Sequence, residues 1–196
     1  MAVHAAQRGM RGFRLADRLL TQSGLVKTPA YCQKLIDNYL DDHWEIRDWY
    51  FVTVRKEVLE RQELWNTWGR CWSCKYDKLD DDLYRRAYSY GPQSECNDLM
   101  VQWGYWPVME EIARQGWKSR VNLLVHDELI LSCPLEEAWD VAKFLVTSLE
   151  QPREYPAGEL VVPMDVSIGA TWGDKVELGV LPGREEFEEK VREVLG

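Results

Sequence analysis

The chain has 196 residues, of which 45% are hydrophobic and 29% are charged, and its formal net charge is −9. These values are typical of a globular protein with one sizeable core, or with one domain and part of another. No stretch approaches the roughly 20 apolar residues of a membrane span, and residues 1–18 are too rich in arginine for a signal peptide. We therefore expect a cytoplasmic protein with no membrane partner.

The five cysteines form an odd set without regular spacing, which argues against a secreted disulfide framework. Cys71 and Cys74 have the spacing of half a zinc site. A second ligand pair is missing because the histidines lie singly, so reduced structural thiols are the favoured interpretation.

Charge is distributed unevenly along the chain. Residues 1–27 carry five basic side chains against one acidic, whereas residues 184–196 carry five glutamates against three basic residues. The first segment could face phosphates. We interpret the acidic end as a solvated terminal helix.

In the first half, hydrophobic spacing predicts mainly helices. One helical pattern covers residues 13–20 and ends near Gly24, and Thr28 with Pro29 predicts the start of a second, long helix. Helical spacing resumes over residues 46–64, followed by a strand-like run at 64–67 and a turn. Another helix is expected from about residue 83 to about residue 105, with Pro92 distorting it.

The second half mixes strands and helices without a strict βαβ rhythm. We expect a hairpin at 123–131, a helix at 135–150, a loop at 151–158, a strand at 160–168 and a last helix from Arg184. This order predicts the α+β class, with helices on one face of a small antiparallel sheet. Trp44, Trp49, Trp103 and Trp106 lie at helical spacings and are expected to pack in the core or between subdomains rather than to stack on bases.

The most informative residues are His126, Asp127 and Glu128, which lie between two short apolar runs. We interpret this stretch as a buried hairpin with polar groups at its turn, because burying an unpaired carboxylate is costly. Two adjacent carboxylates suit a divalent metal and a phosphate-bearing substrate. Taken alone, the triplet favours the simpler interpretation of a solvated polar turn, and the rest of the chain reverses that preference.

Further motifs accompany this hairpin, and they are HAAQRGM (residues 4–10), NTWGR (66–70), RRAYSYGPQSECNDL (85–99) and VPMDVSIGATWG (162–173). In this order and spacing they resemble the C-terminal half of family A DNA polymerases, the DNA polymerase I type, especially the phage members. The resemblance spans almost the whole chain. It implies a partial fingers subdomain of helices in residues 1–64 and a polymerase palm in residues 65–196.

The resemblance also implies DNA-directed DNA polymerase activity with two Mg²⁺ ions. Asp127 matches one of the two metal-holding aspartates of the palm. Glu128 would support or ligate the metal, and His126 would touch the primer terminus.

Contacts with primer-template DNA and dNTP are implied in the same way. Gln93 and Arg85 match the helix that follows the duplex minor groove, where a glutamine amide can meet acceptors present on every base pair. Arg70 matches a DNA contact, although a surface ion pair explains it equally well. His4 and Arg8 match positions in the nucleotide-binding helix, with Arg8 in place of a tyrosine.

In the family pattern, the lysine of that helix and the first catalytic aspartate would precede Met1. The sequence therefore predicts a C-terminal subunit or fragment of a DNA polymerase in DNA replication, in the host cytoplasm if phage-encoded. We expect an N-terminal partner chain to supply the missing aspartate and lysine. The alternative is a catalytically inactive polymerase relic that binds DNA or a partner, and a metal-dependent nuclease is a third possibility.

Overall fold

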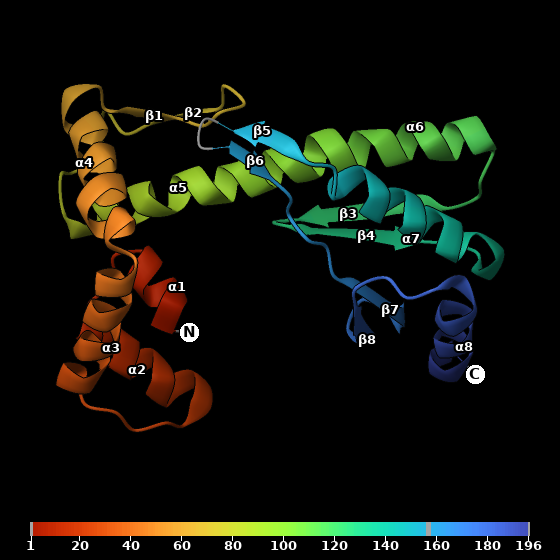
Figure 1. Cartoon of the computed structure of the whole chain (residues 1–196), viewed down its shortest axis with the longest axis horizontal. Coiled ribbons are helices and arrows are strands. Elements are labelled where there is room, and N and C mark those ends of the chain that lie inside the picture. The colour runs from red at the N-terminus through yellow and green to blue at the C-terminus, as the bar shows by residue number, and fades with distance from the viewer. Residues whose placement is uncertain (1, 156–157, 196) are drawn as a thin grey trace. The chain divides into compact units, whose positions relative to one another are not determined.

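The computed structural model describes residues 2–155 and 158–195 and divides the chain into two compact units, Met1–Glu95 and Cys96–Gly196. Helices and short antiparallel strands make up both units (Figure 1), which confirms the predicted α+β class. Within the described residues, the strands form four two-stranded sheets. The units reflect packing alone, and the fingers–palm boundary at residue 64 stays a prediction.

The elements of the first unit begin with three helices and end in a long helix that continues into the second unit. They are α1 (Ala2–Gln7), α2 (Gly12–Ser23), α3 (Pro29–Asp42), the π-helical turn η1 (Ile46–Tyr50), α4 (Phe51–Glu60), β1 (Glu63–Trp65), β2 (Cys71–Ser73) and α5 (Asp81–Leu99).

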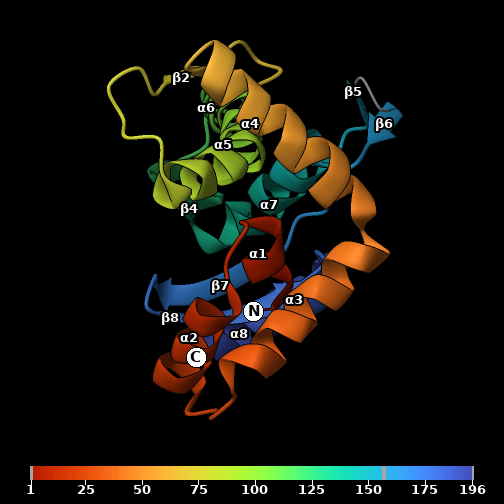
Figure 2. The same cartoon turned by 90° about the vertical axis from the view of Figure 1, so that its left-hand side faces the viewer.

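The predicted ends of α2 and α3 are confirmed. Gly24 adopts a left-handed conformation after α2, and the backbone N–H of Tyr31 donates to Thr28 Oγ1 at 3.2 Å at the start of α3. The two helices lie side by side (Figure 2) and bury Leu15 and Ile36 between them and α1. Local capping signals were therefore enough to locate these helices.

A second core lies under α4, α5 and the β1–β2 hairpin. Val58 and Leu83 are fully buried there, and the ring of Tyr88 stacks on Phe51 with centroids 4.1 Å apart. The sequence indicated strand β1 but missed its partner β2, which is only three residues long.

The continuous helical run that contains Pro92 covers residues 81–115 and is longer than expected. It begins where Asp80 Oδ1 accepts from the backbone N–H groups of Asp82 and Leu83, at 3.0 and 3.1 Å. The expected end near Tyr105 is wrong, because the π-helical turn η2 (Met100–Tyr105) leads directly into α6 (Trp106–Gln115). Pro107 lacks the backbone N–H that would bond within this continuous run, and the carbonyl of Trp103 four residues earlier accepts instead from Ser148 Oγ at 2.5 Å.

The elements of the second unit alternate between short hairpins and helices. They are η2, α6, β3 (Arg120–Val125), β4 (Glu128–Ser132), α7 (Leu135–Leu149), β5 (Arg153–Tyr155), β6 (Gly158–Leu160), β7 (Val166–Thr171), β8 (Asp174–Gly179) and α8 (Arg184–Leu195).

Several expectations for the second unit need correction. The β3–β4 hairpin is present but only partly buried, since Leu123 is 46% exposed. The expected loop at 151–158 contains strands β5 and β6, and the expected strand at 160–168 is replaced by β7, which starts six residues later and pairs with β8. One core cluster is formed by Leu99, Met100 and Leu149 with the side chains around them, and Val108, Val141 and Phe187 are also buried in this unit.

The tryptophans expected in the core lie largely at the surface. Trp44, Trp49 and Trp106 are each more than half exposed, and Trp103 is 38% exposed. Helical spacing shows which side chains share a face, but it does not show whether anything covers that face. No helix among residues 2–155 and 158–195 is long and apolar enough to cross a membrane.

Candidate active site

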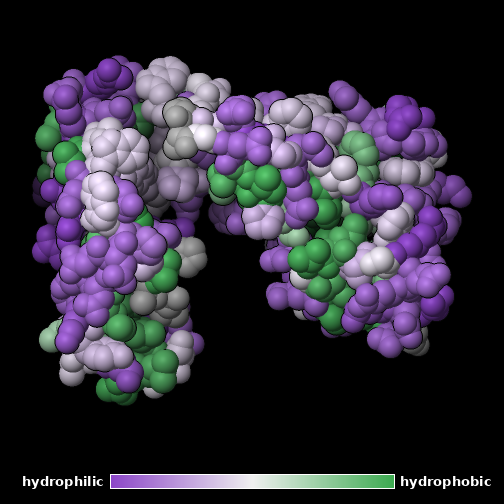
Figure 3. Space-filling model, in the orientation of Figure 1, coloured by the Kyte–Doolittle hydropathy of each residue, from purple (hydrophilic) through white to green (hydrophobic). Residues whose placement is uncertain are grey.

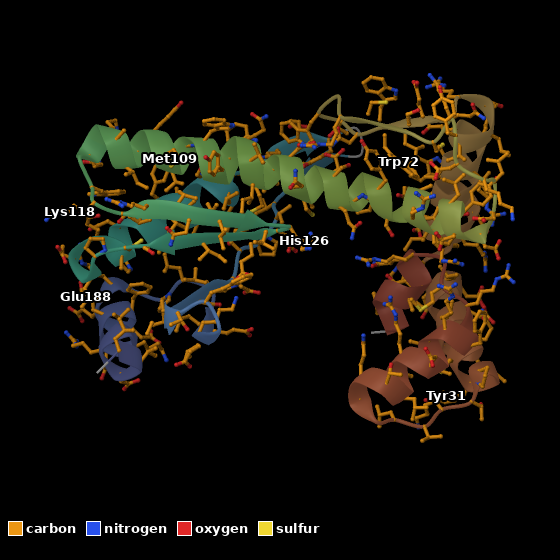
Figure 4. All side chains as sticks on the ribbon, turned by 180° about the vertical axis from the view of Figure 1, so that it is seen from behind. Tyr31, Trp72, Met109, Lys118, His126 and Glu188 are labelled. Carbon is orange, nitrogen blue, oxygen red and sulfur yellow. The ribbon has the colours of Figure 1, made fainter. Side chains whose placement is uncertain are left out.

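The His-Asp-Glu triplet occupies the tip of the β3–β4 hairpin. Val125 pairs with Glu128 across the ladder, so His126 and Asp127 form a two-residue turn. His126 has a φ of 57°, in the left-handed region that such tight hairpin turns require. Figure 4 shows His126 at the tip, and the register therefore presents Asp127 there as well.

The two neighbouring carboxylates have different surroundings. Lys175 Nζ donates to Glu128 Oε1, and the indole Nε1 of Trp172 donates to Glu128 Oε2 at 3.3 Å. The hydrogen bond from Lys175, together with the smaller effect of Trp172, holds the pKa of Glu128 below its usual value of 4.5. Asp127 is exposed and makes no side-chain hydrogen bond or ion pair with any described residue.

These donors fit part of a magnesium site. Mg²⁺ is commonly held by one or two carboxylates together with waters and substrate phosphates, and Asp127 offers one such carboxylate. Across the described part of the chain, no group of three His, Cys, Asp or Glu side chains is placed to hold a metal. A complete site therefore needs ligands from elsewhere.

A cavity of about 740 Å³ lies beside the two carboxylates in the second unit. Asp127 and Glu128 line it together with apolar side chains of β4, α7, β7 and α8, among them Leu129, Leu145 and Ile168. Apolar side chains also reach the surface of this unit, as Figure 3 shows.

In the first unit, two of the expected DNA-facing residues, Arg85 and Gln93, lie along α5, and Ser89 lies midway between them. Gln93 is exposed and has no side-chain hydrogen bond to another described residue. Arg85 is only 19% exposed and donates to Asp82 at 2.9 Å, while Ser89 Oγ donates to the Arg85 carbonyl at 3.0 Å. Of the three side chains, that of Gln93 is the most available to a ligand.

The loop that carries Arg70 is held against α5 by a glutamate that the sequence did not single out. The carboxylate of Glu95 accepts from the backbone N–H and the hydroxyl of Thr67, at 2.6 and 2.7 Å. Tyr90 donates its hydroxyl to the carbonyl of Arg70 at 2.7 Å. Glu95 lies within the motif at 85–99, but nothing in its local sequence points to a partner 28 residues away.

The expected nucleotide-binding residues lie at α1. Arg8 is half-buried just after the helix, where Gly9 has a φ of 61° and packs against Tyr88; a Cβ on Gly9 would lie 3.0 Å from that ring. The side chain of His4 lies outside the described residues.

The candidate residues thus fall into two groups. The structure brings His126, Asp127 and Glu128 together in the second unit, and it joins the loop of Arg70 to the helix of Arg85 and Gln93 in the first. The two groups therefore belong to different units.

Comparison with known proteins identifies the class to which this fold belongs. Residues 6–174 match the family model of DNA polymerase family A, and the chain belongs to that family. The DNA polymerase of Bacillus phage SP01 is 30% identical over an alignment of 108 residues, and the match covers 50% of this chain and 10% of the phage protein.

A solved structure shows the same fold. It is the POL domain of Pol1 from M. smegmatis in complex with DNA primer-template and dNTP, with a TM-score of 0.60 at 19% identity. The match covers 74% of this chain and 25% of that chain. The present chain therefore spans a minor part of both proteins.

Proposed function

We propose that the chain is the C-terminal part of a DNA-directed DNA polymerase and supplies Asp127 to two-metal nucleotidyl transfer in DNA replication. The observation that carries this proposal is the exposed Asp127 carboxylate at the tip of a tight hairpin, which has no side-chain partner among the described residues. Mg²⁺ bound there would neutralise charge that develops on phosphoryl oxygens. Glu128 supports this site, and His126 touches the primer terminus.

In this proposal, the first unit holds primer-template DNA and dNTP. Gln93 donates its amide to minor-groove acceptors, and an exposed side chain without an internal partner can do so at little cost. Arg85 and Arg70 contact the nucleic-acid strands, and His4 and Arg8 contact the dNTP. If the chain is phage-encoded, it acts in the host cytoplasm.

The remaining parts of the polymerase come from an N-terminal partner chain that carries the first catalytic aspartate and the fingers-helix lysine. One observation supports this step: the described residues include no complete group of metal ligands, so the remaining ligands must come from another part of the polymerase.

Primer extension tests the proposal directly. The chain should extend a primer only after addition of a polypeptide that contains the N-terminal part of a family A polymerase. In that reconstituted enzyme, Asp127→Ala should lower extension more than about 100-fold with little loss of duplex binding, because a metal ligand acts mainly on the transition state. Asp42→Ala, at an exposed position in α3, is the matched control.

Three results would contradict the proposal or part of it. Extension by the isolated chain would remove the need for a partner. Extension by the Asp127→Ala variant at the parental rate would remove the hairpin from the metal site. Duplex binding without extension in any preparation would favour the inactive binding module instead.

A further inference from the structure

The β7–β8 hairpin is tied to the tip of the β3–β4 hairpin by one side chain. Both carboxylate oxygens of Glu128 are engaged, one by Lys175 at the start of β8 and one by Trp172 in the turn between β7 and β8. The side chains of Lys175 and Glu128 are 33% and 39% exposed, so solvent screens this ion pair only in part.

The backbone of the β7–β8 hairpin is shaped to bring Lys175 to this position. Gly169 pairs with Lys175 in the ladder, next to a register shift between Gly169 and Thr171. A Cβ on Gly169 would lie 2.1 Å from the carbonyl oxygen of Asp174 and 2.8 Å from the Cα of Lys175. Only glycine allows strand β8 to approach this closely.

The adjacent Asp127 has none of these partners. A cation that approached Glu128 would have to displace an ammonium group and an indole N–H, whereas Asp127 is open to solvent. Adjacent carboxylates with such different surroundings are suited to different tasks.

We propose that Glu128 is an anchor that fastens the β7–β8 hairpin to the active-site tip, with Lys175 and Trp172 as the two donors that hold its carboxylate. The anchor is a property of this chain by itself.

Native-state hydrogen exchange of the full chain tests the anchor through a double-mutant cycle. Glu128→Gln and Lys175→Met should each lower amide protection in β7–β8 about three- to tenfold, the size expected for a partly shielded ion pair. The double variant should lose no more than either single variant, because both remove the same contact. Trp172→Phe, which removes only the N–H donor, should have a smaller effect.

Matched controls separate the anchor from general loss of charge. Glu177 lies on the same hairpin, and its exposed side chain has no ion pair or hydrogen bond to a described residue, so Glu177→Gln is the first control. This control and Lys118→Met should leave protection in β7–β8 unchanged, and protection in α7 should stay constant in every variant. Unchanged protection in Lys175→Met, or independent multiplicative effects in the double variant, would overturn the anchor.

Discussion

Replacing Gly169 with alanine is the sharpest test of how the β7–β8 hairpin is built. The new Cβ would lie 2.1 Å from the Asp174 carbonyl oxygen, whereas real Cβ atoms essentially never approach closer than 3.0 Å. The obstructing atoms belong to backbone and cannot rotate away. Strand β8 must therefore move by about 1 Å, which is enough to break van der Waals contact and weaken the bond from Lys175 to Glu128.

The expected cost is that of overpacking a rigid site, about 1–3 kcal/mol in the free energy of unfolding of the second unit. Gly173→Ala is the matched control, because a Cβ on Gly173 meets nothing within 4 Å and Gly173 does not have a positive φ. This control should be neutral, or stabilising by up to about 1 kcal/mol, since alanine restricts the unfolded chain more than glycine does.

Urea denaturation gives the free energies, and hydrogen exchange shows where the change occurs. We expect Gly169→Ala to lower protection throughout β7–β8 and to leave α7 unaffected. If Gly169→Ala and Gly173→Ala have equal stabilities, the close approach of β8 is not a feature of the protein and the geometric argument fails.

Three further predictions concern the first unit. In the reconstituted polymerase, Gln93→Ala should raise the relative rate of extension from mismatched primer ends about three- to tenfold while changing duplex binding less; an unchanged ratio would assign Gln93 to the helix surface alone. Burial, helped by the nearby Tyr88, raises the pKa of Tyr50 to about 12, so its stabilising effect is full below pH 10 and is lost as pH rises toward 12. Unfolding titrations should show that the parent loses about 2 kcal/mol more than Tyr50→Phe between pH 9 and pH 11.5, and equal losses would contradict this origin. Glu95→Gln should speed amide exchange of Thr67 about tenfold, because it weakens two charge-assisted hydrogen bonds; Glu60→Gln is the control, and equal rates in both variants would show that Glu95 does not hold the loop.

Local chemistry explains most of what the sequence predicted correctly. The N-cap at Thr28, the left-handed Gly24 and the hairpin turn at residues 126–127 each depend on residues a few positions apart. Such short-range signals depend less on tertiary context than contacts between distant residues do. The overall α+β class follows from the order of these elements.

What the sequence missed depends on residues that are distant along the chain. Lys175 lies 47 residues from Glu128. Strand β8 forms by pairing with β7, and the sequence of β8 alone does not indicate that pairing. Helical periodicity likewise could not show that Trp44 and Trp49 remain exposed. The roles assigned to His126, Asp127, Gln93 and Arg85 remain predictions, because no ligand contact bears on them.

Every described strand has a partner on one side only, because the sheets are all two-stranded. Open strand edges are templates for pairing with a second copy, and Leu123 and Val176 add exposed apolar side chains on two of these strands. A net charge of −9 keeps copies apart at low ionic strength. Concentrated preparations of the chain should therefore self-associate as salt screens that repulsion, and dilute, low-salt buffer is the condition in which single molecules persist.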